Sequence, residues 1–374
     1  MRGIGARVVG VCLGTVLLMF VSGELATRMI IEPRISGDMT VEKPGVGQDA
    51  STGLYETDRR LGWVLTPGVE VRHRTVEYSV NYQIDPEGNR STRQREAASL
   101  LINFYGDSIV FGIGVNNHET MPSYLAEILP HMNFTNRAVP GYSPDQYYLS
   151  FTDDLEQRRR PDAVIFGIFP ENDLEGLTQD SVYDPGRGYK TKPILIPSND
   201  SFQLVFPERD FIAPPEGPRA TVTTVLKRSY LINLLYAHGL LIPGFGFLAE
   251  GARELGLTEA DLSMAEAGLT RLEWLVDKIS AMDVPVIYLL VPSRDAFQTR
   301  SERSMKVIRY RVTKELLARK GVSFVDLLAA FPRDSAPYFP LDGHLNATGN
   351  ELAARAVAPR LMELVSAGHG KDRQ

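Results

Sequence analysis

A serine stands at the point where a short, largely apolar stretch of the sequence runs into a turn. Residues 100–104 lead into Gly106-Asp107-Ser108, and a helix-like segment over 109–114 follows. The hydroxyl of Ser108 is therefore expected at a strand-to-helix turn, beside N–H groups of a helix start that can hold an oxyanion. Ser108 is a candidate nucleophile that needs a base. Gly-Asp-Ser taken alone could equally be a helix cap.

Polar residues also follow later apolar stretches. Residues 139–143 come after the second predicted strand, 170–173 after the third, and 341–346 after the fifth. In an open α/β sheet, ligands bind at the carboxyl ends of the strands, so all of these segments should share one edge with Ser108. His344 is the only histidine predicted at that edge, and the usual pKa of an imidazole suits proton transfer.

The sequence predicts an α/β fold, a flavodoxin-like three-layer sandwich with about five parallel strands. The strands are expected at 100–105, 132–137, 162–168, 284–291 and 322–327. The third and fourth are almost wholly apolar, as in a sheet that is covered on both faces. Helical patterns separate or follow the strands at 119–129, 145–158, 260–281, 300–319 and 347–366.

The four polar segments resemble the sequence blocks of the SGNH (GDSL-type) hydrolase superfamily, membrane-anchored bacterial type. The first block matches Gly106-Asp107-Ser108, and the others match Gly141, Asn172, and Asp342 with His344. Upstream, Asn81 and Gly88-Asn89-Arg90 resemble the lead-in of membrane-anchored members. The resemblance covers about residues 55–366 and implies the SGNH hydrolase fold.

The resemblance also implies a role for each block. Ser108 would be the nucleophile, His344 its base, and Asp342 the carboxylate that orients the imidazole. The oxyanion would accept hydrogen bonds from the N–H groups of Ser108 and Gly141 and from the side-chain amide of Asn172. No metal and no organic cofactor would be required.

The sequence departs from the family pattern in two places. Only Gly343 separates Asp342 from His344, where the family usually has two residues. Helical spacing would point the two side chains apart, so an extended or turn conformation is required. Pro170 stands where the family usually has glycine, two residues before Asn172. Asp342 as a solvated loop acid and Asn172 as a turn residue are therefore alternatives.

Composition narrows the class of protein. The chain of 374 residues is 43% hydrophobic and 23% charged, with a net charge of −6, so nucleic acid is not an expected partner. Cys12 is the only cysteine, which excludes an intrachain disulfide and a cysteine-based metal site. The remaining histidines, His73 among them, have no ligand spacing and are expected to be structural or exposed.

The N-terminal region 1–30 is expected to be a signal anchor. Arg2 and Arg7 precede the uncharged, largely apolar run 8–23. An uncleaved anchor is favoured over a cleaved signal peptide, and a buried core helix is a further alternative. The leading arginines predict a cytoplasmic N-terminus. The expected location is the bacterial inner membrane, single-pass, with the catalytic domain facing the periplasm or the cell exterior.

The rest of the chain is expected to form a lead-in and one large domain. Residues 31–95 are expected to be a linker with short strands, and 96–368 the SGNH hydrolase domain. Within it, the long connection 174–257 is either a cap on the substrate side or a surface elaboration. Residues 369–374 are expected to be a disordered tail.

Three functions are compatible with these residues. The first is a serine esterase that hydrolyses an acyl ester, O-acetyl or another carboxylic ester, through an acyl-enzyme. The second is an O-acyltransferase that uses the same residues to modify an envelope or exopolysaccharide glycan. The third is a non-catalytic relative that binds glycan or acyl groups. The partners would be an acyl ester or acylated glycan as substrate and the membrane through the N-terminal helix.

Overall fold

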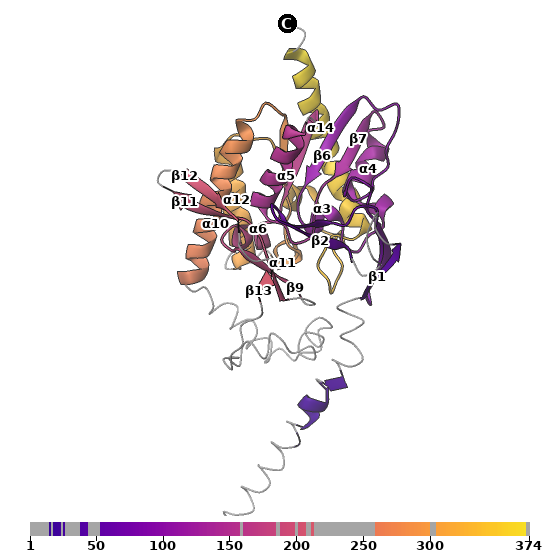
Figure 1. The fold of residues 1–374 in the computed structure, drawn as a ribbon, viewed down its shortest axis with the longest axis vertical. Coiled ribbons are helices and arrows are strands. Elements are labelled where there is room, and N and C mark those ends of the chain that lie inside the picture. Colours follow the sequence, from indigo (N-terminus) through magenta and orange to yellow (C-terminus); the bar gives the residue numbers. More distant parts are fainter. Residues whose placement is uncertain are drawn as a thin grey trace, which may run out of the picture. The chain divides into compact units, whose positions relative to one another are not determined.

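The computed structural model, shown in Figure 1, describes residues 15, 18–23, 25–26, 38–43, 53–157, 160–184, 188–198, 201–206, 211–212, 259–299 and 304–371. The chain forms two compact units, of which the first comprises Met1–Asp38, Arg74–Tyr78 and Pro215–Gly256. The second holds every residue of the candidate site. Most of the predicted anchor, and residues 213–258 of the long connection, lie outside the described residues.

A five-stranded parallel sheet forms the centre of the second unit. Its strands, in the order β15-β14-β8-β6-β7, are Phe324–Asp326, Val286–Leu290, Ala163–Ile168, Leu100–Tyr105 and Met132–Asn136. Every residue of β8 is buried, as its unbroken apolar sequence predicts for a strand covered on both faces. The predicted parallel sheet is confirmed.

The strand order reverses direction beside β6. From β6 the chain first forms β7 on one side, and then crosses to β8 on the other side. The connections that leave β6 and β8 therefore run in opposite directions, which opens a crevice at the carboxyl ends of these two strands. Ser108 follows β6 and Asn172 follows β8, so both lie at this crevice.

Helices cover both faces of the sheet. The helices α4 and α14 pack together, whereas α10 packs against α5, α6 and α12. Because crossovers between parallel strands are right-handed, the reversal beside β6 places these two groups on opposite faces. The bounds of the five longer helices are Met121–Ile128 for α4, Pro144–Glu156 for α5, Glu259–Ser280 for α10, Met305–Arg319 for α12 and Ala347–Lys371 for α14.

One predicted helix begins later than expected. The pattern over 300–319 predicts a helix, and α12 begins at Met305, because Ser304 before it has an extended backbone. A further short helix, α11 (Arg294–Thr299), precedes the predicted range and was not expected.

Short antiparallel strands come from the lead-in and from the long connection. The lead-in contributes β1 (Asp38–Lys43), β4 (Glu70–Arg74) and β5 (Ser79–Gln83), and the hairpin of β2 (Tyr55–Asp58) and β3 (Gly62–Leu65). The first part of the connection 174–257 contributes the sheet β13-β10-β9 and the hairpin β11–β12. These strands are Phe211–Ile212, Gly188–Thr191, Ser181–Asp184, Ile194–Ser198 and Ser201–Val205.

Across the stretches that the structure describes, none of the helices combines the length and the apolar character that a membrane crossing demands.

Candidate active site

Ser108 begins the short helix α3 (Ser108–Phe111) directly after β6. Asp107 caps this helix, because its Oδ1 accepts a hydrogen bond of 2.9 Å from the backbone N–H of Ile109. The turn between strand and helix is tight. A Cβ atom at Gly106 would lie 2.4 Å from Cγ2 of Val110, so only glycine fits there. The strand-to-helix turn that the sequence predicts for Ser108 is therefore present.

His344 contacts Ser108, although the two residues are 236 positions apart in the sequence, and Asp342 contacts His344. The Nε2 atom of His344 lies 2.8 Å from the Oγ atom of Ser108. On the other side of the ring, Nδ1 of His344 is hydrogen bonded to Oδ1 of Asp342. A carboxylate can only accept, so Nδ1 carries the proton and Nε2 is left to accept the hydroxyl proton of Ser108. This is the geometry of a nucleophile, a base and an orienting acid.

The close spacing of Asp342 and His344 is made possible by a turn at Gly343. This residue has φ of +83°, a conformation that glycine adopts without strain. The turn is closed by two backbone hydrogen bonds with Phe339, one from Phe339 N–H to the carbonyl of His344 at 2.9 Å and one from Gly343 N–H at 3.1 Å. The side chains of Asp342 and His344 consequently point the same way, which helical spacing would not allow.

Asp342 also raises the pKa of His344. Burial lowers the pKa of His344, but the hydrogen bond and the charge of Asp342 outweigh that effect, and the charge of Asp107 adds to them. The net result is a pKa for His344 above its ordinary value. A carboxylate beside the ring favours the imidazolium, the form that arises when the ring has taken the proton of Ser108.

Asn172 lies in the short helix α6 (Pro170–Gly176), at the carboxyl end of β8. Pro170 occupies the first turn of this helix, where its missing N–H removes no helical hydrogen bond. The Nδ2 atom of Asn172 donates to Oδ2 of Asp107 over 3.0 Å. One of its two N–H groups is thus committed to the residue that precedes the nucleophile, which fixes the plane of the amide beside Ser108.

Two cations of α12 hold α6 in place. Glu171, the neighbour of Asn172, forms an ion pair of 2.5 Å with Lys306, and its carbonyl accepts from Nη1 of Arg309 at 2.5 Å. Both contacts are made by Glu171, so α12 fixes the residue directly before Asn172.

Gly141 lies in the loop that follows β7, and its φ of +85° again requires glycine. Two aromatic side chains of the neighbouring segments brace this loop. Nε1 of Trp63 donates to the carbonyl of Pro140 at 3.2 Å, and the hydroxyl of Tyr142 donates to the carbonyl of Trp63 at 2.5 Å. The lead-in hairpin β2–β3 is thereby attached to the glycine loop.

His73, which the sequence predicts to be structural or exposed, is buried in β4. Its Nδ1 is 2.8 Å from the hydroxyl of Tyr82, which also accepts from the N–H of Gly114 at 2.9 Å. Burial lowers the pKa of His73 to about 4, against an opposing effect of Asp342 and with a further lowering by His344. His73 is therefore a neutral histidine within electrostatic reach of the catalytic pair. No sequence spacing could have shown this, because the contact depends on how the lead-in folds back.

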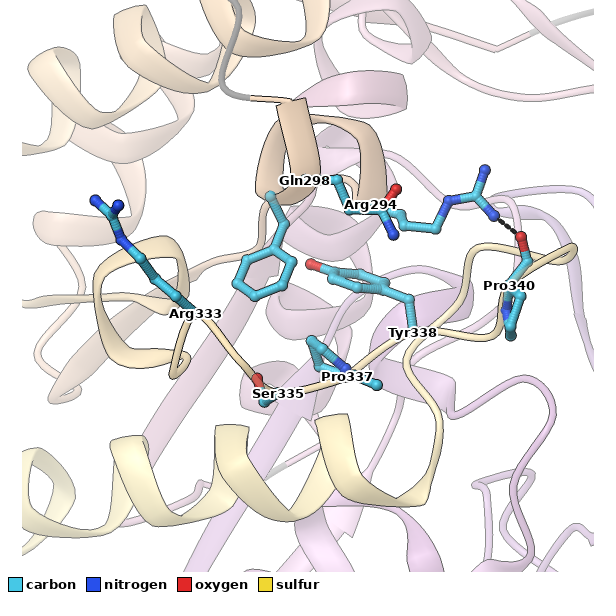
Figure 2. Close-up of a pocket in the computed structure, with 9 residues that line it drawn as sticks. Arg294, Gln298, Arg333, Ser335, Pro337, Tyr338 and Pro340 are labelled. Carbon is cyan, nitrogen blue, oxygen red and sulfur yellow. Dashed lines mark hydrogen bonds between the residues drawn. The ribbon is translucent and has the colours of Figure 1, made fainter. Parts of the chain in front are cut away.

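A cavity of about 490 Å³ lies beside the segment that leads into Asp342. Figure 2 shows its lining, which comes from α11 and from residues 333–340. The rings of Phe297 and Tyr338 are largely buried, and the guanidinium of Arg294 donates to the carbonyl of Pro340. The cavity is thus built on the same loop that presents the base.

Among the described residues, no cluster of three or more His, Cys, Asp or Glu side chains could hold a metal ion.

Comparison with known proteins gives one family match. Residues 253–374 match the model of the family described as SGNH hydrolase-like domain, acetyltransferase AlgX. This stretch contains Asp342 and His344, whereas Ser108, Gly141 and Asn172 precede it. A search of curated protein sequences found no match.

Solved structures resemble the fold at low sequence identity. An acetylxylan esterase from Geobacillus stearothermophilus is 14% identical, with 72% of this chain and 96% of that chain covered at a TM-score of 0.39. A lipase/acylhydrolase from Enterococcus faecalis is 13% identical, with 70% of this chain and 95% of that chain covered at a TM-score of 0.38. A lipolytic protein of the G-D-S-L family from Veillonella parvula is 12% identical, with 71% of this chain and 98% of that chain covered at a TM-score of 0.36.

The C-terminal third of the chain matches a family of SGNH hydrolase-like domains, and the described residues form the five-stranded parallel sheet that the SGNH resemblance implies.

Proposed function

We propose that this protein is a serine esterase that cleaves a carboxylic ester, such as an O-acetyl group, through an acyl-enzyme. The observation that carries the proposal is the hydrogen-bonded series from Ser108 through His344 to Asp342, with 2.8 Å between Oγ and Nε2. A serine hydroxyl is a weak nucleophile at neutral pH unless a base takes its proton. Here the base is in contact with the hydroxyl and is oriented by a carboxylate.

In the first half of the reaction, Oγ of Ser108 forms a bond to the acyl carbon while its proton passes to Nε2 of His344. The carbonyl oxygen becomes an oxyanion, which the N–H groups of Ser108 and Gly141 and the remaining N–H of the Asn172 amide would stabilise. The carbon–oxygen bond to the alcohol then breaks, and the alcohol leaves with the proton of His344. Ser108 is left acylated.

In the second half, a hydroxyl compound attacks the acyl-enzyme. His344 takes its proton, a second oxyanion forms in the same place, and Oγ of Ser108 leaves with the proton from Nε2. With water as the attacking group the product is a free acid, and the protein is an esterase. With a sugar hydroxyl the product is a new ester.

The test is labelling of the full-length protein, purified in detergent, with a fluorophosphonate, followed by mass spectrometry of the adduct. We expect the adduct on Ser108, its loss in Ser108→Ala, and a strong reduction in His344→Ala. Ser150→Ala, which changes a half-buried serine of α5 instead, should label like the unchanged protein. A folded protein that is not labelled at all would contradict the proposal and favour a glycan- or acyl-binding protein.

An O-acyltransferase is a second candidate, because the matched family is described as an acetyltransferase and its matched stretch holds Asp342 and His344. Supplying a glycan acceptor in excess together with an acyl donor distinguishes the two. Growth of the acylated glycan at the expense of free acid supports transfer. Free acid formed at an unchanged rate, without acylated glycan, supports hydrolysis.

We also propose that the N-terminal segment anchors this domain to the bacterial inner membrane with the catalytic face outside the cytoplasm. The arginines at positions 2 and 7 and the uncharged run 8–23 support this. Immunoblotting of membrane fractions tests it. A protein of full-length size that stays with the membrane after alkaline washing is expected, and a soluble protein that starts near residue 24 would contradict the anchor.

A further inference from the structure

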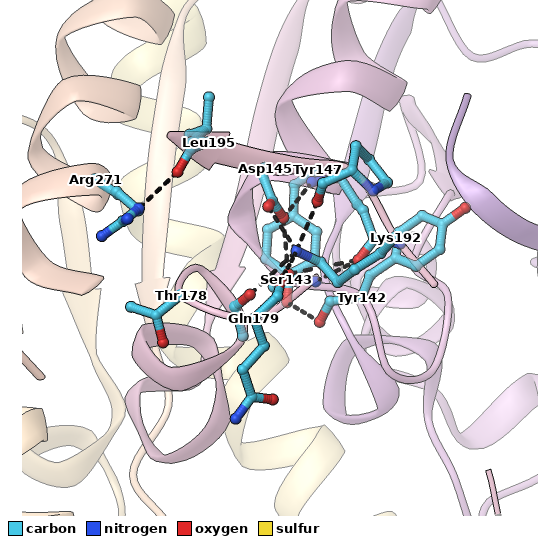
Figure 3. Close-up of polar contacts among 12 residues, drawn as sticks. Tyr142, Ser143, Asp145, Tyr147, Thr178, Gln179, Lys192, Leu195 and Arg271 are labelled. Carbon is cyan, nitrogen blue, oxygen red and sulfur yellow. Dashed lines mark hydrogen bonds and ion pairs between the residues drawn. The ribbon is translucent and has the colours of Figure 1, made fainter. Parts of the chain in front are cut away.

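A buried lysine outside the proposed catalytic machinery connects two elements of the oxyanion hole. Lys192 lies between β10 and β11, and Asp145 lies in the first turn of α5. Both side chains are 0% exposed, and Nζ of Lys192 is 2.6 Å from Oδ2 of Asp145. Figure 3 shows the ammonium group at the centre of these contacts. A fully buried ion pair is costly to form, so its location calls for an explanation.

Through Asp145, the lysine reaches the loop of Gly141. The other carboxylate oxygen of Asp145 accepts from Oγ of Ser143 at 2.7 Å and from the N–H of Gln146 at 2.9 Å. The backbone N–H of Ser143 in turn donates to the side chain of Gln146 at 3.1 Å. Ser143 is two residues beyond Gly141, so this network fixes the end of the loop that presents the N–H of Gly141.

Through a backbone carbonyl, the same ammonium group reaches α6. Nζ of Lys192 donates to the carbonyl of Gly176 at 3.1 Å, and Gly176 is the last residue of the helix that carries Asn172. Further contacts with the carbonyls of Pro193 and Gln179, at 2.8 and 3.2 Å, leave the ammonium well surrounded by acceptors. The lysine is thus hydrogen bonded both to Asp145, which fixes the Gly141 loop, and to the end of the helix that carries Asn172.

Gly176 at the end of α6 and Ser143 at the end of the Gly141 loop are also in direct contact. A Cβ atom at Gly176 would lie 2.8 Å from Cβ of Ser143, closer than real side chains approach. The end of α6 and the end of the glycine loop are therefore packed so closely that no side chain fits at Gly176, and Lys192 is linked to both. A displacement of either by about 1 Å is enough to lower a reaction rate about 100-fold.

From these contacts we propose that Lys192 is a positioning residue, which sets the distance between the oxyanion donors on Gly141 and Asn172. This inference rests on the proposed function. It assigns to the first part of the connection 174–257 a role in catalysis besides any contact with substrate, since the lysine comes from that connection. Because Lys192 is fully buried, it acts through Asp145 and Gly176 and does not touch the reacting atoms.

The test removes both charges together, because a single substitution would leave a buried charge without its partner. In Lys192→Met/Asp145→Asn we expect kcat to fall roughly 10- to 100-fold, with KM changed by less than about twofold, since oxyanion donors act mainly in the transition state. The midpoint of the pH profile should not move, because His344 and Asp342 are untouched. A merely structural pair would lower stability and leave kcat unchanged at a temperature where the variant is folded.

The matched control is the ion pair at the other end of α5. Nε of Arg137 lies 2.5 Å from Oδ2 of Asp154, and these side chains are 13% and 6% exposed. Asp154 is roughly 13 Å along the helix from Asp145 at a rise of ~1.5 Å per residue. Arg137→Met/Asp154→Asn should lower the melting temperature comparably and leave kcat within about twofold of the unchanged protein.

A second variant provides the test if Lys192→Met/Asp145→Asn does not fold. Gly176→Ala keeps the ion pair but pushes α6 away from Ser143, so it should lower kcat in the same way. If the unchanged protein is active and neither folded variant loses kcat, the positioning role is wrong and the esterase proposal stands. If the unchanged protein neither labels nor turns over an ester, the proposed function is wrong and this inference falls with it.

Discussion

The imidazole of His344 is 2.8 Å from the hydroxyl of Ser108, although 236 positions of sequence separate the two residues. The nucleophile comes from the strand β6 inside the sheet, and the base comes from a loop beyond the edge strand β15. The contact therefore exists only when the entire sheet has formed. The proposed activity requires the complete fold, so a loss of activity on substitution identifies a catalytic role only when the variant is shown to be folded.

Asp342→Asn should lower kcat roughly 10³- to 10⁴-fold while the protein remains folded, because an amide cannot hold His344 in the tautomer that accepts from Ser108. Turnover of an acyl ester, compared with circular dichroism of the same preparation, measures this. An activity within about tenfold of the unchanged protein would assign Asp342 to the solvent-exposed loop and not to catalysis.

The pH profile should report His344. Its pKa is raised above the ordinary 6.5, and only the neutral ring can take the proton of Ser108. We expect kcat/KM to rise with pH through a midpoint above 6.5 and to level off on the alkaline side. In Asp342→Asn the midpoint of the residual activity should move down, because the group that raises the pKa is gone. A midpoint that stays in place would show that another group titrates.

Asn172→Ala should lower kcat by about 10²- to 10³-fold with little change in KM, as expected for the loss of one oxyanion donor. The substitution also frees the carboxylate of Asp107, whose pKa is already raised by burial despite the hydrogen bond from Asn172. Asn133→Ala is the control. That asparagine lies in β7, and its amide donates to the carbonyl of Arg95 at 3.0 Å, away from the catalytic edge. Equal losses in both variants would contradict an oxyanion role.

Gly343→Ala tests whether the turn between Asp342 and His344 is needed. Nothing lies within 4 Å of a Cβ atom at this position, so the only penalty is the left-handed backbone, about 1–2 kcal/mol. Gly321→Ala carries the same penalty, since Gly321 has φ of +64° and is equally open, but it lies in the turn before β15. Both variants should lose similar stability in urea unfolding.

Only Gly343→Ala should lose activity, by more than about tenfold, because relaxing its backbone rotates Asp342 away from the imidazole. A pair of variants with equal stability and equal activity would show that the Asp342 side chain is free to reorient.

The sheet was predictable because its strands are marked by local sequence. In β8 the apolar run is unbroken, so composition alone indicates a strand covered on both faces, whereas β7 alternates buried and half-buried residues. Ser108, Gly141, Asn172 and His344 could be selected because each follows a predicted strand and lies in a segment that resembles an SGNH sequence block. Their meeting at one edge then follows from the direction of the strands.

What could not be predicted is held together by contacts distant in sequence. Lys192 and Asp145 are 47 positions apart, and nothing in either neighbourhood indicates a partner. His73 comes near Asp342 because the lead-in folds over the edge of the sheet. The later start of α12 was missed for another reason: the pattern over 300–319 includes Ser304, whose backbone is extended.

The order in which the chain supplies its catalytic groups has a consequence for synthesis. Domains fold progressively as they emerge from the ribosome, with N-terminal parts first. Ser108 is made early and His344 only after the last strand of the sheet, so a growing chain contains the hydroxyl without its base. On the proposed function, a partly made protein cannot cleave the esters it meets, because the chain that carries Ser108 does not yet include His344.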